Sequence, residues 1–452
     1  MTAILTDNIR KNLAKLFIDQ VQDVTDSNEY YVGIGKSTQW NVTDTTTTPV
    51  RTLREERLAR ANLQSIKKVA SSSFVIPRYN WTSGTLYSGY NDATVGIPSN
   101  SYYVLTENNE VYICLQQGKS ATGAANTSTI VPSYSVAGVN VTQAFETADG
   151  YRWKFLYSVS AALANSFLSA GFMPVSFQSD SSGVLTGASR DQALAQEGAT
   201  AGQILGGTIV SGGTGYTSAP TVTVVGNGTG AAATATVSGG AVVKVEMNNE
   251  SAAFGSGYDY ASFTLSGGGG SGASVRPVIT SAKGIGKDAR EDLKSSSVMM
   301  NIKPSGGEGG DWVLGNDFRQ IVVLKNPTDS AGTLFTNNTG RTLKYLTLTT
   351  TGAAFANNTI IRGASSSAGA YVVEISDYNL YYTQDEHTGF GTFTAGETID
   401  DSASAESRIV DLVKASEADA FSGELLYIEN RASINRPGDG SQTEDIKVIV
   451  QV

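Results

Sequence analysis

The sequence has little of the chemistry on which most catalytic and metal sites depend. It contains one cysteine, Cys114, and one histidine, His387. A single cysteine cannot form an intrachain disulfide, and a single histidine excludes an intrachain site with two or three histidine ligands. It also leaves His387 as the sole base for a histidine-activated nucleophile. We therefore expect a protein that is not an enzyme, with no catalytic residue, no metal site and no cofactor.

Charged residues are also scarce, and their balance is acidic. They make up 16% of the 452 residues, and 32 Lys and Arg face 42 Asp and Glu, which gives a net charge of −10. Binding to phosphate backbones needs clustered cations, so nucleic acid is not an expected partner. No apolar run reaches the length of about 18 residues that a transmembrane helix needs, so we expect no membrane span. Residues 1–20 are interrupted by charges and do not resemble a signal peptide.

What the sequence does contain is glycine and uncharged polar residues. Glycine accounts for 49 residues, Thr, Ser and Asn are abundant, and 40% of the chain is hydrophobic. This composition is typical of strands and turns, and it differs from that of disordered chains and coiled coils. The length suggests more than one domain. The predicted fold class is α+β and β-dominated, in a multi-domain chain.

The first 70 residues carry the helical signals. Apolar residues at helical spacing predict a helix capped by Thr6, and they are Ile9, Leu13, Leu16, Phe17 and Val21. A strand is predicted at 30–35 and a second helix at 50–69, after the helix-starting Pro49. One side of that helix carries arginines spaced by three residues: Arg51, Arg54, Arg57 and Arg60. Because Glu55 and Glu56 interleave with them, the arginines form either a solvated face or a protein contact.

Strands dominate the rest of the chain. They are predicted at 74–81, 102–105, 111–115, 151–157, 318–324, 343–350, 370–375, 408–413 and 446–452. Residues 151–157 alternate aromatic with basic side chains, which predicts a half-buried strand. Residues 287–294 are charged and predict a helical connector.

An internal repeat marks the glycine-rich region that starts near residue 192. Gly213–Tyr216 matches Gly255–Tyr258 at an offset of 42 residues, and Gly230-Ala231 matches Gly272-Ala273 at the same offset. We predict two superposable β-units in 205–286, with Gly215 and Gly257 in matching turns of positive φ. A solenoid would need three or more repeats.

Several motifs invite a chemical interpretation, and in each a structural one competes. Gly267–Gly272 lacks the Lys-Ser/Thr of a phosphate-binding loop and favours a turn. Asp385–His387 could bind a metal, but three adjacent residues rarely converge on one ion. Four further acids, Glu397, Asp400, Asp401 and Glu406, lack the spacing of a calcium loop. Cys114 is predicted to be a small buried apolar residue. Paired carboxylates of a glycosidase would be set by spatial separation, which the sequence does not show.

A series of phrases, read in order, resembles one family. The family is the baseplate wedge subunit of T-even-type contractile-tailed bacteriophages, the product of gene eight. The phrases are Val32–Ser37 with Trp40, Val75–Trp81, Val111–Leu115, Asp149–Tyr157, Asp317–Ile321 with Asn326-Pro327, Ser422–Arg431 and Gln442–Lys447. The most specific is Gly-Glu-x-x-Tyr-x-Glu-Asn-Arg followed by Gln-Thr-Glu, and Asp-Gly-Tyr-x-Trp is next.

The resemblance implies a division of the chain into core segments and insertions. The core segments are 1–182, 287–328 and 416–452, which we expect to pack together. Residues 192–286 and 329–415 depart from the family pattern and are interpreted as two inserted small all-β modules.

The resemblance also implies the function. We expect a structural subunit of a phage tail baseplate wedge, which is located in the virion after assembly in the host cytoplasm. It would form a homodimer and hold other baseplate wedge proteins through protein–protein interfaces. The alternative is a receptor- or carbohydrate-binding tail protein, and a glycan-cleaving tail enzyme ranks below it.

Overall fold

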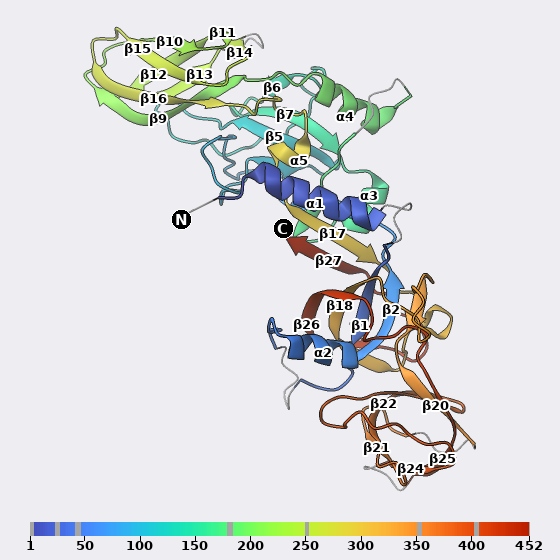
Figure 1. Ribbon diagram of the computed structural model, residues 1–452. Helices are drawn as coiled ribbons and strands as arrows, with labels where there is room; N and C mark the ends of the chain where they lie inside the picture. The colour runs from blue at the N-terminus through green and yellow to red at the C-terminus, as the bar shows by residue number, and fades with distance from the viewer. Residues whose placement is uncertain are drawn as a thin grey trace. The chain divides into compact units, whose positions relative to one another are not determined.

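The computed structural model describes residues 4–22, 28–40, 47–178, 184–248, 253–349, 355–401 and 406–451. The chain forms two compact units. The first comprises Met1–Leu16, Ser73–Met299 and Ile449–Val452, and the second comprises Phe17–Ser72 and Met300–Val448. Strands arranged in several sheets dominate both units (Figure 1). The predicted α+β, β-dominated, multi-domain fold class is confirmed.

The predicted N-terminal helix is confirmed as α1 (Asp7–Gln22), but its buried face is not the predicted apolar stripe. The side chains that are buried are Lys11, Ala14 and Ile18. Of the predicted stripe, Ile9, Leu13 and Leu16 are exposed. Lys11 can be buried because its ammonium pairs with Asp288 at 3.4 Å and Glu291 at 3.0 Å. The helix thus packs through a charged and small-residue face and leaves an aliphatic face in solvent.

The predicted helix at 50–69 is wrong in its second half. Helix α2 spans Leu53–Ala61, and the side chain of its N-cap, Thr52, accepts a hydrogen bond from the backbone of Glu55. Strand β2 (Leu63–Lys68) follows almost at once. It pairs on one side with β1 (Tyr30–Gly35), the strand predicted at 30–35. Pairing on both edges of β2 outweighs its local helical pattern, because the central position in a sheet satisfies its backbone.

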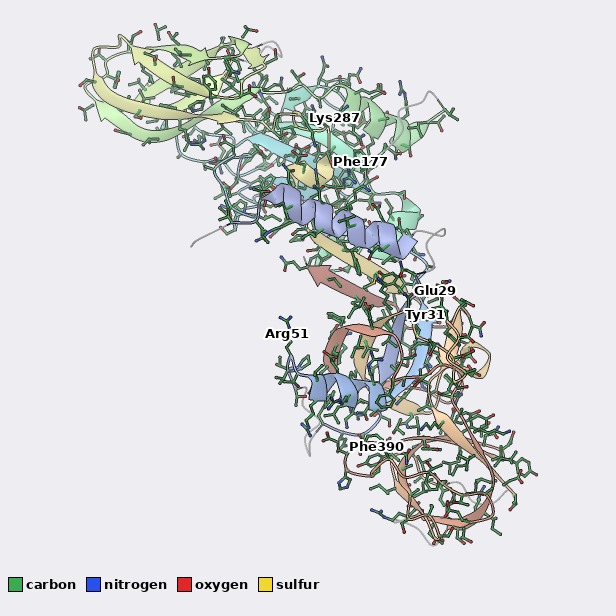
Figure 2. All side chains as sticks on the ribbon, viewed as in Figure 1. Glu29, Tyr31, Arg51, Phe177, Lys287 and Phe390 are labelled. Atoms are coloured by element: carbon green, nitrogen blue, oxygen red, sulfur yellow. The ribbon has the colours of Figure 1, made fainter. Side chains whose placement is uncertain are left out.

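The second unit contains a five-stranded antiparallel sheet. Its order is β19 (Thr339–Arg341), β2, β1, β18 (Asn316–Lys325) and β26 (Glu424–Arg436). The predicted core segments 1–182, 287–328 and 416–452 supply four of these strands, and β19 comes from 329–415. Tyr31 anchors the sheet to the loop before β19, because its hydroxyl donates to the carbonyls of Phe335 at 3.0 Å and Asn337 at 2.8 Å (Figure 2).

The remainder of 329–415 forms a closed antiparallel barrel within the second unit. In order around the barrel, its strands are β20 (Lys344–Leu348), β23 (Asn379–Thr383), β22 (Gly369–Ser376), β21 (Ile360–Gly363), β24 (Thr398–Asp401) and β25 (Ser407–Lys414). Aliphatic and aromatic side chains fill its interior, among them Leu346, Phe355 and Ile399. Thr350, the last residue of the predicted strand 343–350, lies outside the described residues. A 3₁₀ helix, Glu308–Gly310, also belongs to this unit.

The first unit is built around an aromatic sheet. The sheet has the order β4 (Tyr103–Leu105), β5 (Glu110–Gln116), β7 (Arg152–Ser158) and β6 (Ala144–Glu146). Strands β4 and β5 form the predicted hairpin, and Asn109 adopts the left-handed conformation in its turn with a φ of 59°. Tyr151 and Trp153 stack in the core beneath this sheet with ring centroids 5.6 Å apart.

The structure also has a second four-stranded sheet and three short helices. The sheet has the order β27 (Ile446–Gln451), β17 (Ser297–Ile302), β3 (Ser72–Pro77) and β8 (Phe172–Pro174). The helices are α3 (Ala161–Phe167), α4 (Gly187–Glu197) and α5 (Ala289–Asp292). Helix α5 occupies part of the predicted connector 287–294. The predicted boundary at residue 192 falls inside α4, and Val452 of the predicted last strand lies outside the described residues.

The glycine-rich region forms its own β-module. A six-stranded sheet has the order β15 (Ala261–Ser266), β10 (Thr221–Gly226), β12 (Ala233–Ser238), β13 (Ala241–Met247), β9 (Ile204–Thr214) and β16 (Ser271–Ile279). A separate pair joins β11 (Thr229–Ala231) to β14 (Phe254–Ser256).

The 42-residue offset recurs in the backbone of this module. Thr214 pairs with Ser271. The residue 42 positions after Thr214 is Ser256, and the residue 42 positions before Ser271 is Thr229. Ser256 and Thr229 also pair with each other. In the matching turns, Gly215 and Gly257 have φ values of 79° and 73°.

The two repeats also match in a contact between a tyrosine side chain and a glycine. A Cβ on Gly270 would lie 2.5 Å from the ring of Tyr216, and a Cβ on Gly228 would lie 2.5 Å from the ring of Tyr258. Each tyrosine therefore covers a glycine of the other repeat. The two repeats differ outside these matching positions. In the first repeat, β13 forms a hairpin with β12, whereas in the second no strand in the described part of the chain occupies the equivalent place after β16.

Candidate functional site

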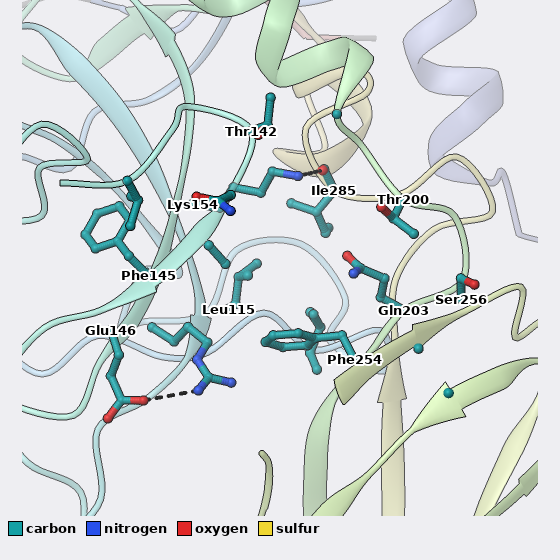
Figure 3. Close-up of a pocket in the computed structure, with 18 of the residues that line it drawn as sticks. Leu115, Thr142, Phe145, Glu146, Lys154, Thr200, Gln203, Phe254, Ser256 and Ile285 are labelled. Carbon is teal, nitrogen blue, oxygen red and sulfur yellow. Dashed lines mark hydrogen bonds and ion pairs between the residues drawn. The ribbon is translucent and has the colours of Figure 1, made fainter. Parts of the chain in front are cut away.

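A cavity of about 760 Å³ opens in the first unit, between the aromatic sheet and the glycine-rich module (Figure 3). Strands β5, β6 and β7 supply one side, and residues 198–205 with β11 and β14 supply the other. Figure 3 shows Phe145 and Glu146 on one side and Gln203 and Phe254 on the other, with Lys154 between them. This volume lies within the range of about 300–1,000 Å³ that is common for small-molecule sites.

The basic residues of β7 form the floor of this cavity. Arg152 and Lys154 are each only 5% exposed, and their aromatic neighbours Tyr151, Trp153 and Phe155 are fully buried. The prediction that 151–157 is half-buried is therefore wrong. The physical reason is that the second face of the strand is also covered, since α4 packs against β7 and Phe254 of β14 lies against Arg152.

Arg152 is held between an acid and an aromatic ring. Its guanidinium donates to Glu146, its cross-strand neighbour on β6, at 3.1 Å. It also lies 5.0 Å from the centroid of the Phe254 ring, at a distance suited to a cation–π interaction. The Glu146 side chain is 43% exposed, so this ion pair reaches from the buried floor of the cavity to solvent.

Lys154 carries a buried amine, and its burial favours the uncharged form. Its Nζ donates to the carbonyl of Ile285 at 2.7 Å. Burial lowers the pKa of Lys154 to about 8, and the nearby Asp292 carboxylate opposes this shift. Burial likewise raises the pKa of Asp292 to about 8, although the backbone N–H of Gly286 donates to it at 2.7 Å. Removal from water thus favours the neutral form of each partner.

Gly286 allows the lysine to reach this position. It has a φ of 96°, in the region that favours glycine, and an added Cβ would lie 3.2 Å from Cε of Lys154. The loop after the glycine-rich module can therefore pass directly beneath the amine. No feature of the sequence marked Arg152 and Lys154 as cavity residues except the alternation of basic and aromatic side chains.

The structure places the glycine run 267–272 where a turn was predicted. It connects β15 to β16, and Gly267, Gly268, Gly269 and Gly272 all have positive φ. A Cβ on Gly268 would lie 2.6 Å from the carbonyl oxygen of Ser218, so glycine is needed there for packing. The turn interpretation is confirmed.

The arginines of the predicted stripe diverge in their roles. Arg51 precedes α2 and extends into solvent (Figure 2). Arg54 pairs with Glu386 at 2.6 Å on the surface of the same unit, with both side chains more than half exposed. Arg60 donates to the carbonyls of Ala420, Ser422 and Gly423 at distances of 2.6–3.0 Å. The stripe is therefore divided between solvent and contacts within the chain.

The acidic motifs are occupied by local contacts. Asp385 accepts hydrogen bonds from the backbone N–H groups of His387 and Thr388, which folds the triplet into a turn. Glu397 accepts from Ser365 and Ser366. Burial alone would raise its pKa, but hydrogen bonds from Ser366 and Thr394 outweigh burial and lower the value to about 2. Within the described ranges, no group of three His, Cys, Asp or Glu residues is arranged to hold a metal ion.

Cys114 is fully buried in the aromatic core, and its predicted role as a small apolar residue is confirmed. Its Sγ lies 3.3 Å from the carbonyl oxygen of Gln116. Burial raises the pKa of the thiol well above its usual value, which disfavours the reactive thiolate.

No protein-family model matches the chain, and no curated protein sequence matches it. Among the residues that the structure describes, no helix is long and apolar enough to cross a membrane.

Proposed function

We propose that the protein is a structural subunit of a bacteriophage tail baseplate wedge, where it forms a homodimer and holds neighbouring wedge proteins through protein–protein interfaces. The proposal starts from the resemblance in the sequence. It is supported by the way in which the resembling phrases, distant in sequence, meet in the fold. Its place of action would be the virion, after assembly in the host cytoplasm.

The observation that carries the proposal is the contact between phrases from three core segments. In the five-stranded sheet, Ile34 of β1 pairs with Ile321 of β18, and Ile321 pairs with Glu429 of β26. These residues belong to the Val32–Ser37, Asp317–Ile321 and Ser422–Arg431 phrases. The side chains of Gln320 and Asn430 also bond to each other, at 2.8 Å.

Gly423 shows why such phrases would be needed for the fold. It has a φ of 65°, and a Cβ there would lie 2.5 Å from the carbonyl oxygen of Lys325 and 2.8 Å from N of Pro327. The glycine of one phrase is thus fitted against the Asn326-Pro327 of another. Residues that interlock in this way serve a rigid scaffold, which is what a structural subunit requires.

The exposed face of α1 supports a protein contact. Ile9, Leu13 and Leu16 are 45%, 42% and 59% exposed, and Leu5 just before the helix is 60% exposed. A surface helix normally turns such a stripe towards its own core. Clustered aliphatic side chains in solvent are typical of protein–protein interfaces. This face belongs to the 1–182 segment, from which we expect the shared contact to come.

Light scattering on the purified full-length chain, coupled to size-exclusion chromatography, tests the proposal. We expect twice the chain mass at micromolar concentration, since an obligate dimer should bury roughly 2,000 Å² or more. A monomer at that concentration would contradict the homodimer. Turnover of host glycans by the same preparation would contradict the non-enzymatic role.

A further inference from the structure

The cavity beneath the glycine-rich module carries two cations on one strand face. Arg152 and Lys154 are two residues apart on β7, so their side chains leave the strand on the same side. Both are about 95% buried and both line the cavity. Among the described residues that line the cavity, only Glu146 carries a carboxylate. The floor of the cavity therefore carries two cationic side chains, with Glu146 paired to Arg152 and the buried carboxyl of Asp292 near Lys154.

The amine of Lys154 lines this cavity and can donate more hydrogen bonds than it makes. An ammonium group carries three N–H donors. Among the described residues, the hydrogen bonds of its Nζ reach one acceptor, the carbonyl of Ile285. Buried donors without acceptors cost free energy, and an anionic ligand would supply the missing acceptors. Charge-assisted bonds of this kind are stronger than neutral ones.

The rest of the lining suits a hydroxylated ligand rather than a purely apolar one. Hydroxyl and amide side chains line the cavity beside the cations: Thr142, Gln143, Thr200, Gln203, Thr229 and Ser256. Apolar patches from Leu205 and Phe254 lie among them. A sugar ring presents the same mixture, with hydroxyl groups at its rim and apolar C–H groups on its face.

We propose that this cavity binds an acidic sugar, a hexuronate whose carboxylate is held by Lys154. The hydroxyl groups of the sugar would bond to Gln203 and the neighbouring threonines, and its apolar face would lie near Phe254. Arg152 and Glu146 would stay paired with each other beside the ligand. This binding site is independent of the proposed structural role, and it needs no chemical step.

Isothermal titration calorimetry with three ligands tests the proposal on the full-length chain. The ligands are sodium glucuronate, glucose and sodium acetate. Glucose has the hydroxyl groups without the charge, and acetate has the charge without the hydroxyl groups. We expect glucuronate to bind at least tenfold more tightly than either. Equal binding of acetate, equal binding of glucose, or no binding of glucuronate at millimolar concentration would overturn the proposal.

Variants assign the binding to this cavity. Lys154→Met should weaken glucuronate binding at least tenfold, and the exposed-residue control Lys414→Met should leave it unchanged. Because loss of a buried amine can disturb folding, Gln203→Leu provides a second variant, which removes an amide from the wall and not a charge from the floor. It should also weaken glucuronate binding and should leave acetate binding unchanged. Unaltered glucuronate binding in Gln203→Leu, or in a folded Lys154→Met, would place the ligand elsewhere and refute the inference.

Discussion

Arg436 donates two hydrogen bonds to Glu444, from Nε and Nη2, and each is 3.0 Å long. Arg436 is 1% exposed, and its guanidinium also donates to the carbonyls of Val313 and Gly306. It lies 5.4 Å from the centroid of the Trp312 ring. Glu444 belongs to the Gln-Thr-Glu phrase of the family resemblance. One buried ion pair thus ties the end of β26 to the segment that leads into β27.

Glu444→Gln should destabilise the second unit by about 3–5 kcal/mol, because it leaves the buried Arg436 charge without a counter-ion. Urea unfolding followed by hydrogen–deuterium exchange of the β26 peptide measures the change. The control is Glu386→Gln, which breaks the exposed pair with Arg54 and should leave the free energy of unfolding nearly unchanged. Equal effects of the two variants would show that burial does not set the value of the Arg436 pair.

The tyrosine–glycine contacts of the β-module should be energetically equivalent. Gly228→Ala and Gly270→Ala each place a methyl group 2.5 Å from a tyrosine ring, and each should cost about 1–3 kcal/mol through overpacking. Gly171→Ala is the control, because no atom lies within 4 Å of its Cβ position. Thermal unfolding measures all three. A large effect from one module variant with none from the other would contradict the reciprocal packing of Tyr216 and Tyr258.

Asp292 should make the first unit less stable as pH rises. Its pKa is raised by burial from 3.8 to about 8, so the folded chain keeps a proton that the unfolded chain loses between these values. The stabilisation is complete below about pH 4 and is lost as pH rises through about 8. Lys154, whose pKa falls to about 8, gives the opposite trend above that pH.

Asp292→Asn should remove this pH dependence. Hydrogen–deuterium exchange of the β7 peptide, recorded between about pH 5 and pH 8 after correction for intrinsic exchange, measures it. The natural chain should lose protection across this range, and the variant should not. Asp377→Asn is the control, because Asp377 is an exposed turn residue whose φ of 52° asparagine tolerates. A natural chain with constant protection over the range would contradict a proton held at Asp292.

The aliphatic face of α1 should contribute to self-association. The double variant Leu13→Asn with Leu16→Asn should weaken the dimer at least tenfold in sedimentation velocity and should barely change thermal stability, since both side chains are exposed. Val136→Asn, at a residue that is 88% exposed outside the helices and strands, is the matched control. An unchanged dimer in the double variant would place the contact on another surface.

Local patterns predicted the strands that are buried on both faces. Residues 30–35 were predicted as a strand and form β1 with the same bounds, because a short apolar run between polar segments has few other structures. The hairpin at 102–115 was equally readable, since Asn109 supplies the left-handed turn. The segment 63–68 was not, because its strand state depends on partners at 31–35 and 339–341.

The cavity could not be predicted from the sequence in the same way. The burial of Arg152 and Lys154 depends on Phe254, about 100 residues later, and on a loop at Ile285. Neither of these neighbours carries a motif. Similarly, the helical pattern of 7–22 marked an apolar stripe, but the buried face was decided by Lys11 meeting acids near residue 290. The periodicity of apolar residues identifies an apolar face of a helix, but it does not show which face of the helix packs against the rest of the protein.

Cryo-electron microscopy of the virion tests the structural role most directly. The structural role predicts density for this chain in the tail baseplate, as two copies in each wedge that touch through residues of 1–182, 287–328 or 416–452. A single copy in each wedge, a pair that touches only through 192–286 or 329–415, or a position outside the baseplate would contradict it.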